Sequence, residues 1–131
     1  MATDALLALQ ASVTKTATFN GAALTLAGGT PRRGLVARVI YSAATAASGT
    51  DTITFSIDVS YDAGSTWNSD FLAPAVGPLT TTALSGEIFI PFSISPTSVA
   101  NGTQIRLTAT FSSSAHTDTI TYAGDIMLGR P

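Results

Sequence analysis

Apolar and polar residues alternate along much of this chain, and the alternation is clearest between Thr52 and Ser60. The same period of two returns over residues 88–94, 105–111 and 120–128. Successive side chains of a β-strand point to opposite faces of the sheet, so this period indicates strands with one buried face and one hydrated face. The sequence therefore predicts β-strands over all four segments.

Leu35–Tyr41 departs from this alternation because it is apolar on both faces apart from Arg38. Strands that are covered on both faces have this pattern, so we expect the segment to be a central strand. Pro91 cannot donate a hydrogen bond to a neighbouring strand, which predicts an edge strand or a bulge around it. Gly124 predicts a kink in the last strand.

A weaker alternation over residues 13–19 ends at Asn20-Gly21, a dipeptide that suits the positive φ angles of a hairpin turn. We therefore expect residues 22–27 to pair with residues 13–19. Segments rich in Gly, Pro, Ser, Thr and Ala separate the predicted strands and are expected to be loops. Seven or eight short strands predict an all-β, single-domain antiparallel β-sandwich, either jelly-roll or immunoglobulin-like, with the strand order left open.

Composition supports the all-β prediction and argues against several classes of function. Charged residues make up only 11% of the chain, so the polar surface comes mainly from 14 Ser and 21 Thr, and Thr favours strands. The net charge of −2 argues against binding to nucleic acid or anionic lipid, which needs clustered cations. The absence of Cys excludes thiolate chemistry. Without a long apolar run or a secretion signal, we expect a soluble protein made in the cytoplasm.

Residues 60–67 read Ser-Tyr-Asp-Ala-Gly-Ser-Thr-Trp and match the Asp-box pattern S-x-D-x-G-x-T-W. An aspartate in this position accepts hydrogen bonds from the amides of the turn, and the glycine takes a backbone conformation that a Cβ disfavours. We expect a structural turn, with sugar binding through Trp67 as the alternative. The residues of the turn are Ser60, Asp62, Gly64, Thr66 and Trp67.

No catalytic constellation stands out. His116, the only histidine, lies near Ser114 and Asp118, but a triad depends on spatial geometry and a Ser-rich loop supplies such neighbours by chance. A calcium site would need carboxylates from different segments and stays open as an alternative. Its candidate ligands are Asp51, Asp58 and Asp62. The sequence thus predicts a protein that is not an enzyme and holds no cofactor and no metal.

The segments Asn20–Leu24, Gly29–Val39 and Ile53–Val59, followed by the Asp-box, resemble the head decoration (cement) proteins of tailed bacteriophages. The resemblance spans roughly residues 12–70. It implies a β-rich subunit that is made in the host cytoplasm, binds the major capsid protein on the capsid exterior, and reinforces the shell without catalysis. It also implies a homo-oligomer, often a trimer.

Two groups of residues are candidate contacts for such a partner. Residues 1–11 are predicted to be an arm that orders against the partner, or a short helix on the domain's own sheet, ahead of a sandwich over residues 12–131. Arg32 and Arg33 could bind carboxylates of the partner, the alternative being a solvated turn. The apolar candidates in the arm are Leu6, Leu7 and Leu9.

Because the chain carries few charges, we expect binding to a partner to depend weakly on salt. Two other functions remain open from the sequence alone. One is a tail or neck component of the same virion, which has similar physical demands. The other is a carbohydrate-binding β-sandwich that uses Trp67, Tyr61 and Tyr41 as a stacking platform.

Overall fold

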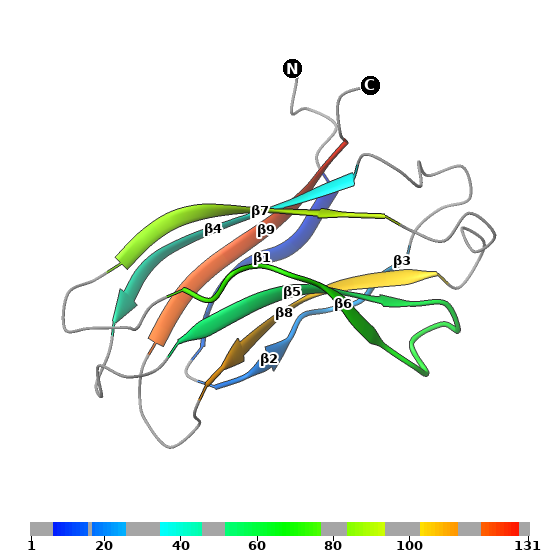
Figure 1. Ribbon diagram of the computed structural model, residues 1–131, viewed down its shortest axis with the longest axis horizontal. Helices are drawn as coiled ribbons and strands as arrows, with labels where there is room; N and C mark the ends of the chain where they lie inside the picture. Colours follow the sequence, from blue (N-terminus) through cyan, green and yellow to red (C-terminus); the bar gives the residue numbers. More distant parts are fainter. Residues whose placement is uncertain are drawn as a thin grey trace.

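A computed structural model confirms the all-β prediction. Within the part of the chain that it describes there is no helix, and hence none long enough to span a membrane. The strands are antiparallel and form two sheets that pack face to face, as a single-domain β-sandwich requires (Figure 1). The described residues are 7–15, 17–25, 35–45, 52–76, 84–93, 103–112 and 119–128.

Nine strands are present in these ranges. They are β1 (Leu7–Lys15), β2 (Phe19–Asn20), β3 (Leu24–Thr25), β4 (Leu35–Thr45), β5 (Ile53–Ser60), β6 (Asn68–Leu72), β7 (Leu84–Phe92), β8 (Gln104–Phe111) and β9 (Thr119–Leu128). Sheet A has the order β1-β9-β4-β7. Sheet B has the order β2-β8-β5-β6, and β3 also pairs with β8. The alternating segments of the sequence therefore lie in β5, β7, β8 and β9, as predicted.

The strand order distinguishes between the two expected sandwiches. The pairs are nested along the chain: β1 pairs with β9, β2 and β3 with β8, β4 with β7, and β5 with β6. The β4–β9 and β5–β8 ladders then join these pairs into two sheets. This nesting is that of a jelly roll. In the immunoglobulin fold the first two strands share a sheet, whereas β1 and β2 lie in different sheets here.

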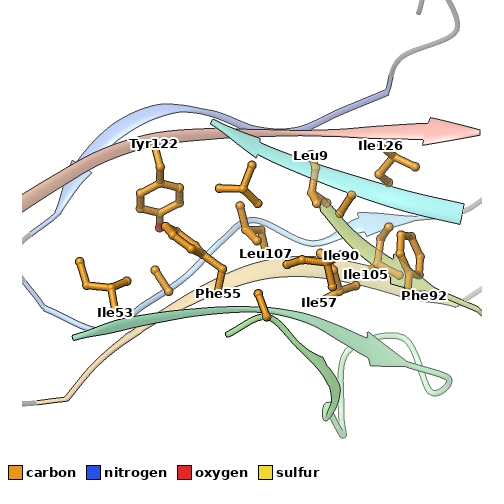
Figure 2. Packing of buried hydrophobic residues seen from close by; sticks show 14 of the residues in the cluster. Leu9, Ile53, Phe55, Ile57, Ile90, Phe92, Ile105, Leu107, Tyr122 and Ile126 are labelled. Atoms are coloured by element: carbon orange, nitrogen blue, oxygen red, sulfur yellow. The ribbon is translucent and has the colours of Figure 1, made fainter. Parts of the chain in front are cut away.

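The core lies between the two sheets and is built from the inward positions of the alternating strands. Phe55 contacts Tyr122 edge to face, with ring centroids 5.1 Å apart, and stacks with Tyr41 at 6.3 Å. Figure 2 shows the side chains of both sheets pointing toward one another in this layer. Each fully buried Ile or Phe contributes roughly 2 kcal/mol of transfer free energy, so the alternation itself drives the closure of the sandwich.

The predictions for individual strands fare differently. β4 has β9 on one side and β7 on the other, so the prediction of a central strand over Leu35–Tyr41 is confirmed. β7 is an edge strand, as Pro91 predicted. Gly124 is buried where the sheets approach closely, since a Cβ there would lie 2.8 Å from Leu107 Cδ2. The two register shifts that flank Gly124 in the β1–β9 ladder come from extra residues in β1 and not in β9.

The predicted hairpin around Asn20-Gly21 is wrong. β1 ends at Lys15, and both β2 and β3 pair with β8 instead of with residues 13–19. The Gly21 amide donates to Leu107 O at 2.8 Å, so the dipeptide lies along β8 and does not turn the chain back. The physical reason is that residues 13–15 already pair with β9 while β2 and β3 pair with β8, so both halves of the expected hairpin find backbone partners on strands that are distant in sequence.

The prediction of an N-terminal arm or short helix over residues 1–11 also needs correction. Residues 7–11 belong to β1, which pairs with β9 at the edge of sheet A. Leu9 is only 5% exposed and lies in the core. Burial of this side chain and the ladder to β9 together hold the segment on the domain's own sheet. The first six residues lie outside the described ranges.

Candidate functional site

The Asp-box forms the turn between β5 and β6, at one end of the sandwich (Figure 1). Asp62 Oδ1 accepts hydrogen bonds from the Thr66 amide and from Ser60 Oγ, both at 2.8 Å. Ser60 Oγ in turn accepts from the Gly64 amide at 2.9 Å. Gly64 has a φ of 95°, which only glycine adopts readily. The donors, above all the Thr66 amide and then Ser60, lower the pKa of Asp62.

Trp67, the last residue of the motif, lies against the side chain of Arg106 on β8. The guanidinium carbon is 4.2 Å from the centroid of the indole ring, a cation–π contact. Arg106 also donates through Nε to Asp58 Oδ2 at 3.1 Å. One face of the indole is therefore occupied by a group of the protein itself, and the turn is fastened to the sheet.

Asp58 is the centre of a polar cluster on the outer face of sheet B. Its Oδ1 accepts hydrogen bonds from Ser56 Oγ at 3.1 Å and Ser69 Oγ at 2.8 Å. Its Oδ2 accepts from Arg106 and from Thr108 Oγ1 at 2.7 Å. Asp58 is only 1% exposed, so all four donors act in a largely desolvated setting. The carboxylate is fully used within the protein and supplies no free oxygen for a ligand.

These contacts bear on the chemical candidates from the sequence. Asp58 is paired with a cation, and among the described residues no group of three His, Asp or Glu side chains could hold a metal ion. Tyr41 belongs to sheet A and stacks on Phe55 inside the sandwich, so it does not join Trp67 in a sugar platform. The remaining candidates lie outside the described ranges: Asp51, Ser114, His116 and Asp118.

Only two of the five predicted partner contacts, Leu7 and Leu9, lie in the part of the chain that the structure describes. Leu9 is in the core, so the prediction that it contacts a partner is wrong, because its side chain already packs between the sheets. Leu7 belongs to β1, where it pairs with Ile126 of β9. Leu6, Arg32 and Arg33 lie outside the described ranges.

A different surface emerges on the outer face of sheet A. Large apolar side chains stand exposed there: Ile40 of β4 is 42% exposed and Phe89 of β7 is 51% exposed. Neighbouring positions on the same face are held by Val36 and Pro91, which are register partners. The apolar pattern of Leu35–Tyr41 predicted cover on both faces of this strand, and the structure shows cover on only one.

The charges on this face are largely paired with one another. Arg38 donates through Nη2 to Asp125 Oδ2 at 3.0 Å, and its Nη1 lies 3.7 Å from Glu87 Oε2. Arg38 keeps about a quarter of its side chain exposed, while Glu87 keeps almost half. Exposed pairs of this kind add little stability. The face thus combines exposed apolar side chains with one arginine that two carboxylates share.

No family model matches this chain, and no curated protein matches its sequence. Ile40 and Phe89 were not predicted as a contact surface, because the pattern of Leu35–Tyr41 predicted that Ile40 is covered within the domain and the alternation over residues 88–94 places Phe89 on the hydrated face. The signal was nevertheless present, since a strand that is apolar on both faces needs cover on both.

Proposed function

We propose that the protein is a structural component of a phage virion, which binds the outer surface of the capsid and stabilises the shell through protein–protein contacts. The observation that carries this proposal is the exposure of Ile40 and Phe89 on the outer face of sheet A. A central strand that is apolar on both faces gains free energy when a second body covers its open side. The major capsid protein is the partner that the resemblance to decoration proteins implies.

The polar clusters of the described part favour adhesion over catalysis. The carboxylate of Asp58 is filled by four donors, and Arg106 is shared between that carboxylate and Trp67. These groups hold the β5–β6 turn in place. Because Asp58 and Trp67 each contact Arg106, the role of these three residues is structural. This supports a subunit that acts through the shape of its surface.

The test is cosedimentation of the protein with expanded capsid shells of its phage. The double variant Ile40→Thr/Phe89→Thr removes the exposed apolar side chains while keeping strand-forming residues. About half of each side chain is open, and covering that half contributes about 1 kcal/mol of binding free energy for each residue. Losing both contributions, about 2 kcal/mol in all, should weaken binding by about 30-fold. Leu72→Thr is the matched control, because Leu72 is 63% exposed but lies on β6 in the other sheet.

Wild-type binding should change little between low and moderate salt, since apolar contact dominates the proposed interface. Equal binding by the double variant and the wild type would refute the proposed surface. A steep loss of binding with salt would refute the proposed mechanism. Immunogold labelling of virions separates a capsid position from a tail or neck position.

A further inference from the structure

Among the described strands, the four sheet edges differ in how well they are protected against pairing with another strand. In sheet B, β2 and β3 have two residues each, and β6 has five residues with a register shift against β5. In sheet A, β1 is interrupted by two register shifts against β9. β7, by contrast, has nine residues and pairs with β4 without a break from Gly86 to Phe92. Short strands and bulges blunt an edge, so β7 is the edge most open to another strand.

Pro91 indicates which backbone groups of β7 face outward. Proline has no N–H, and an edge strand accommodates it where that position points away from the neighbouring strand. Backbone groups alternate in direction along a strand, so Glu87 and Phe89 share the outward orientation of Pro91. Their N–H and C=O groups point away from β4, toward the open edge. Their side chains stand on the outer face of sheet A, where both are exposed.

We propose that two copies of this chain pair antiparallel along β7, about a two-fold axis at Ile88, so that sheet A continues from one copy into the other. In this register Glu87 of each copy lies opposite Phe89 of the second copy. The pairing allows about six backbone hydrogen bonds between the copies within Leu84–Phe92, with Pro91 contributing only its carbonyl.

Charge and shape favour this register and a second copy as the occupant. An axis at Glu87 would allow as many backbone bonds but would place two carboxylates opposite each other, which is destabilising. The axis at Ile88 instead sets the two Phe89 rings on a diagonal, within reach of each other. Because Ile40 lies diagonal to Phe89 within each chain, the paired copies present one continuous apolar stripe: Ile40, Phe89, then Phe89 and Ile40 of the second copy.

This pairing goes beyond the proposed capsid binding and does not depend on it. The hydrogen bonds lie in the plane of the sheet, so the apolar stripe stays on the outer face and remains open to a further partner. A two-fold pair also differs from the trimer that the resemblance implies, because an isologous edge contact closes after two copies. The dimer is therefore expected in the isolated protein, without capsids.

The experiment is sedimentation equilibrium of the full chain at micromolar concentration. We expect a mass of twice 13.3 kDa for the wild type. Phe89→Glu places a second carboxylate directly opposite Glu87 of the other copy and should raise the dissociation constant of the dimer by about 10-fold or more. Leu72→Glu, on the edge of sheet B, should leave the dimer intact. A monomeric or trimeric wild type, or a dimer insensitive to Phe89→Glu, would overturn the proposal.

A second measurement tests the register with folded protein. The chain has no Cys, so an engineered pair reports only on the designed contact. Under mild oxidation the double variant Glu87→Cys/Phe89→Cys should form a covalent dimer, because these positions face each other across the axis. Neither single variant should do so. Efficient cross-linking of Glu87→Cys alone would place the axis elsewhere and contradict the register.

Capsid binding and pairing are separable. Ile40 lies one strand away from the β7 edge, so Ile40→Thr should weaken capsid binding while the dimer persists. Dimers that fail to bind capsids would refute the proposed function alone. Monomers that bind capsids would refute the pairing alone.

Discussion

The Asp58–Arg106 pair allows a quantitative test of what holds the outer face of sheet B together. Arg106→Met removes the guanidinium and keeps an unbranched side chain of similar length beside Trp67. The Asp58 side chain is 2% exposed, so its charge would lose its cation in a desolvated place. Removing one partner of a buried pair costs about 3–5 kcal/mol. We expect about 3 kcal/mol here, because the hydroxyl donors to Asp58 remain and Arg106 is partly exposed.

Arg38→Met is the matched control on the opposite sheet. Arg38 makes an ion pair of similar length, 3.0 Å to Asp125, but both side chains are a quarter or more exposed. Exposed pairs contribute about 0–1 kcal/mol, so this variant should lose far less stability. The comparison changes the same residue type to the same replacement and varies the burial of the carboxylate.

The assay is urea unfolding at pH 7, followed by far-UV circular dichroism and by the fluorescence of Trp67, the only tryptophan. At roughly 3–5 °C for each kcal/mol, Arg106→Met should also lower the melting temperature by about 10 °C. Its indole emission should change in the folded state, because the guanidinium stacked on the ring is gone.

A loss of stability equal to that of Arg38→Met would refute the assignment of Asp58 as a buried, ion-paired carboxylate. The double variant Asp58→Asn/Arg106→Met provides a further check. It removes the buried charge along with its cation, so it should be more stable than the sum of the two single losses predicts. Strict additivity would show that the two side chains do not interact.

Three further predictions concern single positions. The hydroxyl of Tyr122 is buried and has no hydrogen-bond partner among the described residues, so Tyr122→Phe should raise the free energy of unfolding by about 1 kcal/mol in urea titrations. Burial raises the pKa of Tyr122 from 10.0 to about 12, so the wild type should lose stability between pH 10 and 12, as the unfolded chain ionises first, and the variant should lose less. The pKa of Asp62 is lowered below 3.8, chiefly by the Thr66 amide; the resulting stability is present above pH 3.8 and lost as the pH falls through the folded value. The difference between wild type and Asp62→Asn, followed by thermal unfolding, should therefore vanish in acid, and a constant difference would contradict a role for the charge. Gly21→Ala would place a Cβ 2.7 Å from Leu107 O, a backbone atom, and should cost about 1–3 kcal/mol in urea unfolding; an unchanged midpoint would show that β2 shifts freely.

Features that depend on a single strand or turn were accessible from the sequence. The alternation in residues 52–60 and 105–111 predicts β5 and β8, because the period of side chains along a strand is a local property. The Asp-box likewise contains its own hydrogen-bond donors and acceptors within a few residues. Pro91 indicated an edge strand because its missing N–H constrains any neighbour.

Features that depend on partners distant in sequence were not accessible. The hairpin expected at Asn20-Gly21 does not form because β2 pairs with β8, whose register partners lie about 90 residues further along the chain. Leu9 was assigned to an arm because nothing in the neighbouring sequence shows the core that its side chain enters. The Asp58 cluster draws donors from three strands, whose proximity only the jelly-roll nesting creates.

The sequence by itself determined that this chain forms antiparallel strands with apolar inner faces and a self-contained turn at residues 60–67. Only the tertiary structure decided which strands pair, that the nested order is a jelly roll, and that Ile40 and Phe89 remain open to solvent. The physical reason is that burial of an apolar side chain is favourable against any apolar surface, so the side chain does not determine which surface covers it. That choice depends on the spatial order of the strands, which is set by contacts across the whole chain.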